Sequence, residues 1–588
     1  MVKNNSKNTT NSSRANSRRT AFTEFGIVLV LIVVLNVIGS FVFTRIDLTS
    51  EKRYTLSEAT RNILSSLDDY VYFRVYLEGD FPAGFKKLRR ETREMLDEFR
   101  AYSKFVEYKF VNPSESTDEQ ERQATYQLLV ESGLNPTDLQ VRTNEGTNQQ
   151  LIFPGALVNY RDKELAVDFL ETQLNMTPEA ALNASAQNLE YKLADVIHKV
   201  TRLQRPAIAI VEGHGELDED QLYDFTQTLL QNYRVDFIEI NGRLNALTRR
   251  SEPDKSGRSD ILLNYDAVVI AKPQQPFDEK DKFILDQYLM HGGKILWMID
   301  PVQASMDSLQ TAESTVGVDL VLKLNDQLFK YGVRLNRNLL LDLNAAALGI
   351  RTGESGGRPQ IDFFRWYYFP LLEAASEHPM VRNMNAVKAE FVSSIDTVIR
   401  EGVRKTPLLK TSGYTRIAGT PALISLTMLQ SDPDPRVYNR SSQTAAWLLE
   451  GQFPSLYANR MPPEISSSGE IGFKEESKPT AMIVIADGDM ARNQFHMQQG
   501  YPLPLGYDQY TRQTFGNKAF LLNAISYLVE GDGLISIRSR ELKLRLLDAN
   551  KVNPQRLQWQ LFNTLLPVAL IILSGLLFAW LRKRRFTR

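Results

Sequence analysis

Two long apolar segments lie near the two ends of the chain and frame its hydrophobic pattern. Residues 25–43 and 559–581 contain no charged side chain. A helix rises about 1.5 Å per residue, so each segment is long enough to cross a hydrocarbon core of roughly 30 Å. Between the two segments, short alternating runs and helical spacings follow one another. This pattern predicts a large α/β region between two transmembrane helices.

Basic residues flank both apolar segments on their outer sides. Lys3, Lys7, Arg14, Arg18 and Arg19 precede the first segment, and residues 582–585 (RKRR) follow the second. The positive-inside rule then predicts that both termini are cytoplasmic and that the large region between them is periplasmic, at the inner membrane. A cleaved signal peptide would share the basic start. The length of the first apolar run and the lack of an A-x-A site after it favour a retained anchor.

The pattern of residues 71–201 predicts a first α/β domain. Strands are expected at 71–77, 105–111, 151–160 and 164–170, and helices at 85–102, 119–132 and 188–201. A strand, a crossover helix and a second strand make a parallel pair. The element order resembles a thioredoxin-like domain, although the chain has no cysteine for thiol chemistry.

A second α/β pattern begins at residue 207. Strands are expected at 207–211, 235–240, 267–271, 294–299 and 481–486, with helices at 218–232, 278–291 and 517–528. The alternation predicts an open, mostly parallel, doubly wound sheet. From about residue 310 to 478 the alternation breaks, and we expect an insertion of helices mixed with Pro- and Gly-rich loops.

These patterns predict seven segments. They are a disordered cytoplasmic tail (1–20), a first transmembrane helix (21–44), a thioredoxin-like α/β domain with a linker helix (45–203), a second α/β domain with the insertion (204–535), a juxtamembrane segment (536–558), a second transmembrane helix (559–581) and a basic cytoplasmic tail (582–588).

The composition and the motifs exclude several functions. The net charge of −1 gives no overall basic field for binding nucleic acid. The sequence contains no cysteine nucleophile, no H-E-x-x-H zinc motif and no G-x-x-x-x-G-K-[ST] phosphate loop. We therefore expect no catalytic residue, no resident metal and no cofactor.

Acidic residues follow several of the strands expected in the second domain. Glu212, His214 and Glu216 follow the first strand, and Asp300, Asp487 and Asp489 follow two others. The carboxyl ends of parallel strands share one edge, where open α/β sheets bind ligands. The six side chains could form an acidic crevice for a cation, a sugar or an amine. Alternatively, they serve as caps and turn residues.

Three further features of the sequence allow more than one interpretation. His198 and His378 are expected to be solvated rather than catalytic. The aromatic run at residues 363–369 (FFRWYYF) could be a partner surface or a buried strand.

Seven stretches carry a resemblance to a known family. They are RYTLSEATRNIL (53–64), AIVEGHGE (209–216), HGGKILWMIDP (291–301), ISLTMLQ (424–430), VIADGDM (484–490), GNKAFLLNAISYLV (516–529) and ISIRSRELKLRLLD (535–548). In these, the chain resembles the auxiliary component of gliding-motility ABC transporters of the GldG type, found in Bacteroidota. The resemblance implies a separate ABC ATPase and a separate permease as partners. It also implies a glutamine-amidotransferase-like fold for the second domain.

Three functions remain open from the sequence. The first is a non-catalytic, membrane-anchored auxiliary subunit whose periplasmic domain docks on the permease or on an envelope partner. The second is a periplasmic enzyme or small-ligand-binding protein that uses the acidic crevice. The third is a structural tether between the inner membrane and the envelope. The missing nucleophile and zinc motif weigh against an enzyme.

Overall fold

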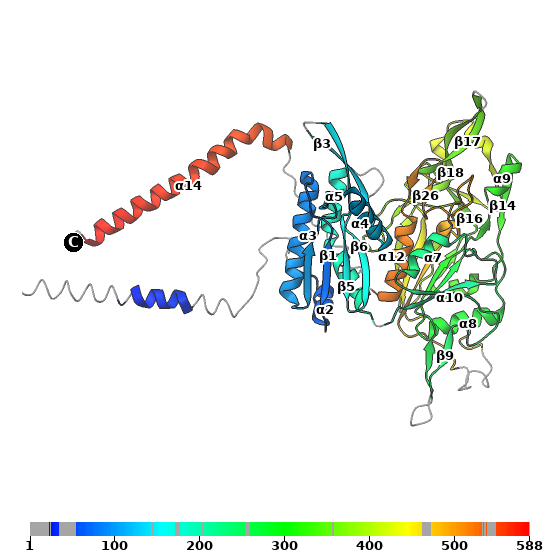
Figure 1. The fold of residues 1–588 in the computed structure, drawn as a ribbon. Coiled ribbons are helices and arrows are strands. Elements are labelled where there is room, and N and C mark those ends of the chain that lie inside the picture. Colours follow the sequence, from blue (N-terminus) through cyan, green and yellow to red (C-terminus); the bar gives the residue numbers. More distant parts are fainter. Residues whose placement is uncertain are drawn as a thin grey trace, which may run out of the picture. The chain divides into compact units, whose positions relative to one another are not determined.

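The computed structural model describes most of the chain. The described residues are 23, 25–34, 55–143, 146–170, 177–202, 204–252, 259–355, 358–460, 472–531, 533, 537 and 549–586. The chain divides into two units (Figure 1): Leu56–Glu541 form one, and Met1–Thr55 with Leu542–Arg588 form the other. Each unit is described by itself below.

A four-stranded sheet organises residues 56–201. Its strands are β1 (Val71–Val75), β2 (Val106–Phe110), β5 (Gly155–Tyr160) and β6 (Lys163–Asp168). The order is β2-β1-β5-β6; β1 and β2 are parallel, whereas β5 is antiparallel to β1 and to β6. The predicted parallel pair with a crossover helix is therefore confirmed.

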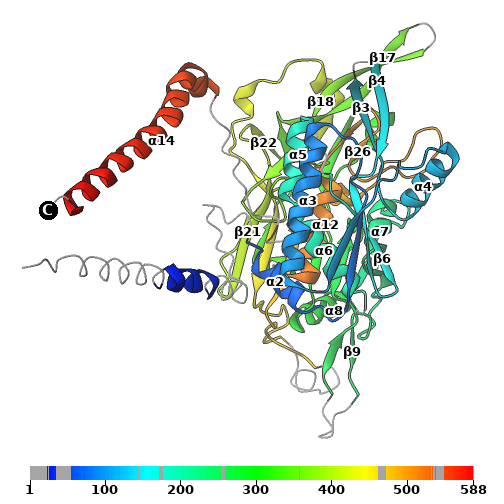
Figure 2. The same ribbon diagram turned by 60° about the vertical axis from the view of Figure 1, so that its left-hand side comes forward.

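Helices cover both faces of this sheet. They are α2 (Glu58–Ser65), α3 (Ala83–Tyr102), α4 (Glu119–Glu131), α5 (Pro178–Gln187) and α6 (Leu189–Thr201). Helices α3, α5 and α6 lie together (Figure 2) and bury Phe73 of β1 under Leu96 and Leu193. On the opposite face, Leu129 of α4 packs against Leu157 of β5. Because successive side chains of a strand point to opposite faces, the strands contribute to one hydrophobic layer on each face of the sheet.

The expected strand over 151–160 is wrong in its extent. It is divided between β4 (Gly146–Ile152), which forms a hairpin with β3 (Thr137–Thr143), and β5. Pro154 lies in the break, and a proline cannot donate to a continuous ladder.

A parallel core of five strands organises the second part of this unit. In spatial order the strands are β25 (Thr480–Ile485), β12 (Ile295–Met298), β11 (Ala267–Ala271), β7 (Ala207–Glu212) and β8 (Arg234–Glu239). Every residue of β11 and β12 is buried, as expected for parallel strands covered on both faces. Helices α7 (Tyr223–Leu230) and α12 (Asn517–Glu530) pack on one face, and α8 (Glu279–Met290) and α10 (Asn325–Tyr331) on the other.

The insertion is built mainly of strands, so the expected mixture of helices and loops is wrong. Four of its strands continue the central sheet beyond β25: β24 (Thr444–Gly451), β21 (Val403–Lys410), β18 (Arg358–Ala374) and β17 (Ala345–Ser355). Each is antiparallel to its neighbour, so the full sheet is mixed rather than mostly parallel. Strand β24 pairs with the free edge of β25 and satisfies backbone groups that would otherwise stay unpaired.

The smaller elements of this unit lie around the central sheet. The paired strands are β9 (Thr248–Arg250) with β10 (Ile261–Leu263); β14 (Ser314–Asp319) with β13 (Val302–Gln303) and β23 (Ala422–Ser425); β15 (Val333–Leu335) with β20 (Ile395–Thr397); β16 (Asn338–Asp342) with β22 (Thr415–Gly419); β19 (Val387–Lys388) with β18; and β26 (Tyr507–Asp508) with β27 (Gln513–Thr514). The short helices are α9 (Asp307–Thr311), η1 (Leu426–Leu429), η2 (Pro435–Val437) and η3 (Asp489–Ala491).

The aromatic run at residues 363–369 lies in β18. Trp366 and Tyr368 are buried and their rings contact each other, whereas Phe363 is 51% exposed. The second half of the run is thus a buried strand, one of its two expected interpretations.

The described residues of the terminal unit include two apolar helices. Helix α14 (Ala549–Phe586) contains the whole second apolar segment. Among the described residues, Gln555–Arg584 is long and apolar enough to cross a membrane, and the most apolar 18 residues within it have a mean hydropathy of 2.3. The other helix, Phe25–Val34, has 10 residues. Residues 35–43 of the first apolar segment and the predicted tail at 1–20 lie outside the described residues.

Candidate functional site

The parallel strands bring the predicted acidic residues to one edge of the central sheet. Glu212 ends β7, Asp300 lies two residues after β12, and Asp487 lies two residues after β25. Lys272, which the sequence analysis did not include, directly follows β11 between them. The side chains at this edge form two groups, one around His214 and one around Lys272.

The loop after β7 is tightly closed around His214. Gly213 and Gly215 have φ angles of +108° and +74°, which favour glycine. A Cβ atom on Gly215 would lie 3.2 Å from the side chain of Gln274, so the loop also needs a small residue there. The carbonyl oxygen of His214 accepts hydrogen bonds from the backbone N–H groups of Gln274 and Gln275, both at 2.8 Å. The loop is thereby joined to the segment after β11.

The imidazole of His214 is buried between two carboxylates and an aromatic ring. It stacks on Phe277 with the ring centroids 3.8 Å apart. Its Nε2 lies 3.1 Å from Asp281 Oδ2, and its Nδ1 lies 3.4 Å from Glu216 Oε1 without forming a hydrogen bond. Glu216 accepts the backbone N–H of His214 through its other oxygen, at 2.6 Å.

These carboxylates determine the charge of His214. Burial lowers the pKa of the imidazole, but Glu216 and Asp281 outweigh burial, and the net pKa is raised. Asp281 also accepts the backbone N–H of Gly242 at 2.7 Å. The contact with Asp281 joins His214, in the loop after β7, to the start of α8, and Asp281 joins that helix to the segment after β8. Both ring nitrogens of His214 face carboxylates of the protein itself.

Glu212 lies in an acidic part of this edge. It is opposite Glu239 in the pairing of β7 with β8. Burial and then the nearby carboxylates of Glu219, Glu216 and Glu239 raise its pKa. This carboxyl group is therefore easier to protonate than an ordinary glutamate.

The second group is centred on the ammonium of Lys272. Lys272 Nζ forms a hydrogen bond with Asp489 Oδ2 and lies 3.5 Å from Asp300 Oδ2. Asp300 Oδ1 accepts the backbone N–H of Gly488 at 2.6 Å, and Arg492 lies 3.4 Å from Asp489 Oδ1. The ends of β11, β12 and β25 are thereby held together by charge.

Asp487 connects this group to the insertion. Its Oδ1 accepts the backbone N–H of Asp489, and its Oδ2 accepts that of Glu390, both at 2.8 Å. The Glu390 carboxylate pairs with Lys388 Nζ at 2.9 Å. Lys388 and Glu390 come from the insertion and could not be assigned to this edge from the sequence. Lys272 could have been, because it follows a buried strand just as Asp300 and Asp487 do.

The three aspartates hold protons more tightly than exposed aspartates. Burial raises the pKa of Asp300 to about 6, against the attraction of Lys272. Burial and the neighbouring carboxylates raise the pKa of Asp487, and burial raises that of Asp489. The same carboxylates raise the pKa of Lys272 despite its burial. A cavity of about 30 Å³ beside Asp489 and Glu390 has room for about one water molecule.

The six predicted residues thus reach one edge. His214 and Glu216 form a network with Asp281, whereas Asp300, Asp487 and Asp489 belong to the group around Lys272. The described residues contain no group of three or more His, Cys, Asp or Glu side chains arranged to hold a metal ion. Chemically, the two networks can hold the segments that follow β7, β11, β12 and β25 in place through charge pairing and hydrogen bonds.

His198 and His378 have local contacts of their own. His198 is half-buried on α6, and burial followed by the charge of Arg202 lowers its pKa. His378 Nδ1 accepts the backbone N–H of Met380 at 3.3 Å, and its ring lies edge-on to Tyr527.

Comparison with known families decides the identity of the chain. Residues 205–524, more than half of the chain, match the family described as ABC-type uncharacterized transport system. The chain belongs to this family of ABC transport auxiliary components. Members of this ABC-type transport family are associated with an ABC transport system, and this association applies to the present chain. Residues 50–159 match a domain of unknown function (DUF7088).

Two individual proteins resemble this member of the ABC transport auxiliary family. An uncharacterized protein of Borreliella burgdorferi is 19% identical over 573 residues, and the match covers 96% of both chains. The mmIFT52 N-terminal domain has 12% identity and a TM-score of 0.29, and the match covers 55% of this chain and 98% of that one.

Proposed function

We propose that this protein is a non-catalytic, membrane-anchored auxiliary subunit of an ABC transporter needed for gliding motility. Both termini lie in the cytoplasm, the helices at the two ends span the inner membrane, and the α/β region is periplasmic. That region docks on the permease or on an envelope partner, and a separate ATPase supplies the energy.

Helix α14 is the observation that carries this proposal. The apolar part of Gln555–Arg584 has none of its surface buried within the protein. So long an apolar helix is stable in a bilayer, where its backbone hydrogen bonds are satisfied internally. Positive charges at residues 582–585 support a cytoplasmic end. The apolar sequence of residues 25–43 supports a second span.

Two observations support a role without catalysis. The sequence contains no P-loop motif, so another subunit has to hydrolyse ATP. At the carboxyl edge of the sheet, where a ligand would bind, His214 faces Glu216 and Asp281, and Lys272 lies between two aspartates. Side chains that are paired with one another in this way stabilise the edge of the sheet rather than activate a substrate.

The topology supports finer assignments for the two parts of the periplasmic region. The order β2-β1-β5-β6, with one parallel pair, favours a thioredoxin-like fold for the first. The five parallel strands with helices on both faces favour a glutamine-amidotransferase-like core for the second.

Copurification tests the proposed partners. The full chain, tagged and solubilised in a mild detergent, is expected to retain an ABC ATPase and a permease that mass spectrometry identifies. A chain ending at residue 548 lacks α14 and should retain less of both. Recovery of the full chain without either subunit would contradict the proposal.

A reporter that is active only outside the cytoplasm tests the topology. Inserted near Gly257, it should be active, and fused after Arg588, it should be silent. Activity at both positions, or only after Arg588, would contradict two spans with both ends inside.

Deletion of the gene tests the link to motility. The deletion strain should fail to spread on a surface, and the full-length gene should restore spreading. Normal spreading of the deletion strain would remove gliding from the proposal without affecting the transporter role.

A further inference from the structure

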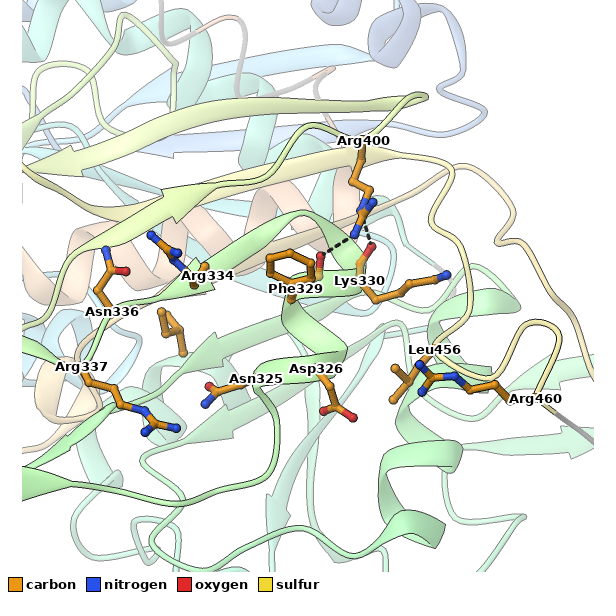
Figure 3. Close-up of a pocket in the computed structure, with 11 residues that line it drawn as sticks. Asn325, Asp326, Phe329, Lys330, Arg334, Asn336, Arg337, Arg400, Leu456 and Arg460 are labelled. Carbon is orange, nitrogen blue, oxygen red and sulfur yellow. Dashed lines mark hydrogen bonds between the residues drawn. The ribbon is translucent and has the colours of Figure 1, made fainter.

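A groove rich in positive charge lies on the second α/β part (Figure 3). None of its lining residues belongs to the network around Lys272. Its volume is about 860 Å³, and its 11 lining residues come from α10, from β15 and from the loops that follow β15, β20 and β24. Five are basic and one is acidic. The basic residues are Lys330, Arg334, Arg337, Arg400 and Arg460, and the acidic residue is Asp326. The whole chain has a net charge of −1, so this groove is a local departure from the average.

Asp326, the acidic residue of the groove, forms an ion pair with Lys282. Asp326 lies 2.8 Å from Nζ of Lys282, a side chain only 2% exposed. The same ammonium lies 3.1 Å from Glu279, so it offsets part of the negative charge of Asp326. The five basic residues still outnumber this one carboxylate in the lining.

Two of the arginines have a carboxylate on one side and free donors on the other. Arg334 pairs with Asp396, and Arg337 Nη1 lies 2.9 Å from Asp319 Oδ2. These pairs hold the side chains in place, and both are half-exposed. A guanidinium has five N–H donors, so each arginine keeps donors for an anion.

The other three basic residues leave their charge uncompensated within the described part of the chain. Arg400 donates to the carbonyl oxygens of Lys330 and Phe329, at 3.1 and 3.3 Å, and neither acceptor carries a net charge. Lys330 and Arg460 form no salt bridge with any described residue.

Lys405 and Phe329 show the surroundings of Arg400 in this groove. Burial and then the charge of Arg400 lower the pKa of the nearby Lys405. Phe329 is 46% exposed, and its ring lies beneath the Arg400 guanidinium, 5.6 Å away. The ring supplies an apolar floor between the cations (Figure 3).

We propose that this groove binds an anionic ligand that carries two or more phosphate or carboxylate groups. The planar guanidinium of arginine can donate two parallel hydrogen bonds to a carboxylate or to a phosphate, and Lys330 and Arg460 supply charge that no described carboxylate neutralises. The amides of Asn325 and Asn336 line the same wall and can orient the polar part of a ligand. The volume suits a small molecule of metabolite size.

Calorimetric titration of the full chain in a non-ionic detergent tests the site. The probes are sodium tripolyphosphate for phosphate groups and sodium citrate for carboxylate groups. Saturable binding of at least one probe at low salt is expected, and it should weaken as sodium chloride is added. The Lys330→Ala/Arg460→Ala double variant should bind about tenfold more weakly or worse.

A matched control carries two equivalent losses of charge elsewhere. Arg90→Ala/Lys109→Ala removes two exposed cations from α3 and β2 and should bind as the wild type does. Arg460→Glu, a single change at an exposed loop residue, should weaken binding even if the double variant folds poorly. The proposal is overturned if neither probe binds the wild type, or if the groove variants bind as tightly as the control.

Discussion

The ammonium of Lys272 lies 3.5 Å from the Asp300 carboxylate and joins the ends of two adjacent parallel strands. Lys272 follows β11 and Asp300 follows β12, so the pair closes the sheet edge at which a ligand would otherwise enter. Asp489 contacts the same ammonium from the end of β25. The position typical of a ligand site in an open α/β sheet is here occupied by the protein's own charges.

Replacement of Lys272 by methionine should strongly destabilise residues 56–541. Lys272→Met leaves Asp300 and Asp489 buried without their cation. Breaking a buried ion pair costs about 3 to 5 kcal/mol. Chemical denaturation of the purified protein measures this loss. Lys109→Met, at an exposed lysine of β2, should change the free energy of unfolding by less than about 0.5 kcal/mol. Equal effects of the two changes would show that the network stabilises nothing.

The stability should depend on pH through Asp300. Its pKa is about 6 in the folded protein and 3.8 as the reference value, so the folded state binds the additional proton between these values. The stabilisation associated with this proton is fully present below about pH 4 and is lost as the pH rises through about 6. The loss is on the order of 2 to 3 kcal/mol.

Asp300→Asn isolates this contribution. Asparagine cannot lose a proton and can still accept the N–H of Gly488. The free energy of unfolding of the wild type, minus that of Asp300→Asn, should fall between pH 4 and pH 6 and level off above pH 7. A difference that stays constant over this range, or that rises with pH, would contradict the raised pKa.

The two halves of the aromatic run should respond differently to truncation. Trp366 is fully buried in β18, and Trp366→Ala should cost about 3 to 5 kcal/mol. Phe363 is on the same strand but 51% exposed, and Phe363→Ala should cost less than about 1 kcal/mol. Thermal unfolding of both variants gives the comparison. If Phe363→Ala left stability unchanged but reduced copurification of a partner subunit, the exposed half would be a partner surface.

The strands of the parallel core could be predicted because the local sequence of each one indicates a strand. The run Ala267–Ala271 is apolar throughout and was expected at the bounds that the structure has. Helix α7 was expected from residue 218 but begins at Tyr223. The acidic residues at 218–220 fit a helical start as well as they fit the turn that the structure forms there.

The insertion was not predictable in the same way. Strands β21 and β24 are separated by β22, β23 and short 3₁₀ helices, and their pairing brings together residues distant in sequence, such as Val403 and Gly451. Helical spacing and turn residues are local signals. They carry no information about which sheet edge a strand will join.

The sequence by itself determined the two apolar segments, the α/β class, the parallel strands and the edge at which Glu212, Asp300 and Asp487 meet. These follow from periodicity and from the direction of parallel strands, which are properties of short stretches. Only the tertiary structure decided that Lys272 would pair with Asp300 and Asp489, that Asp281 would face His214, and that basic residues from α10, β15 and three loops would line one groove. Those relationships depend on burial and on contacts across long separations, because charge pairing in a folded protein is decided by distance in space.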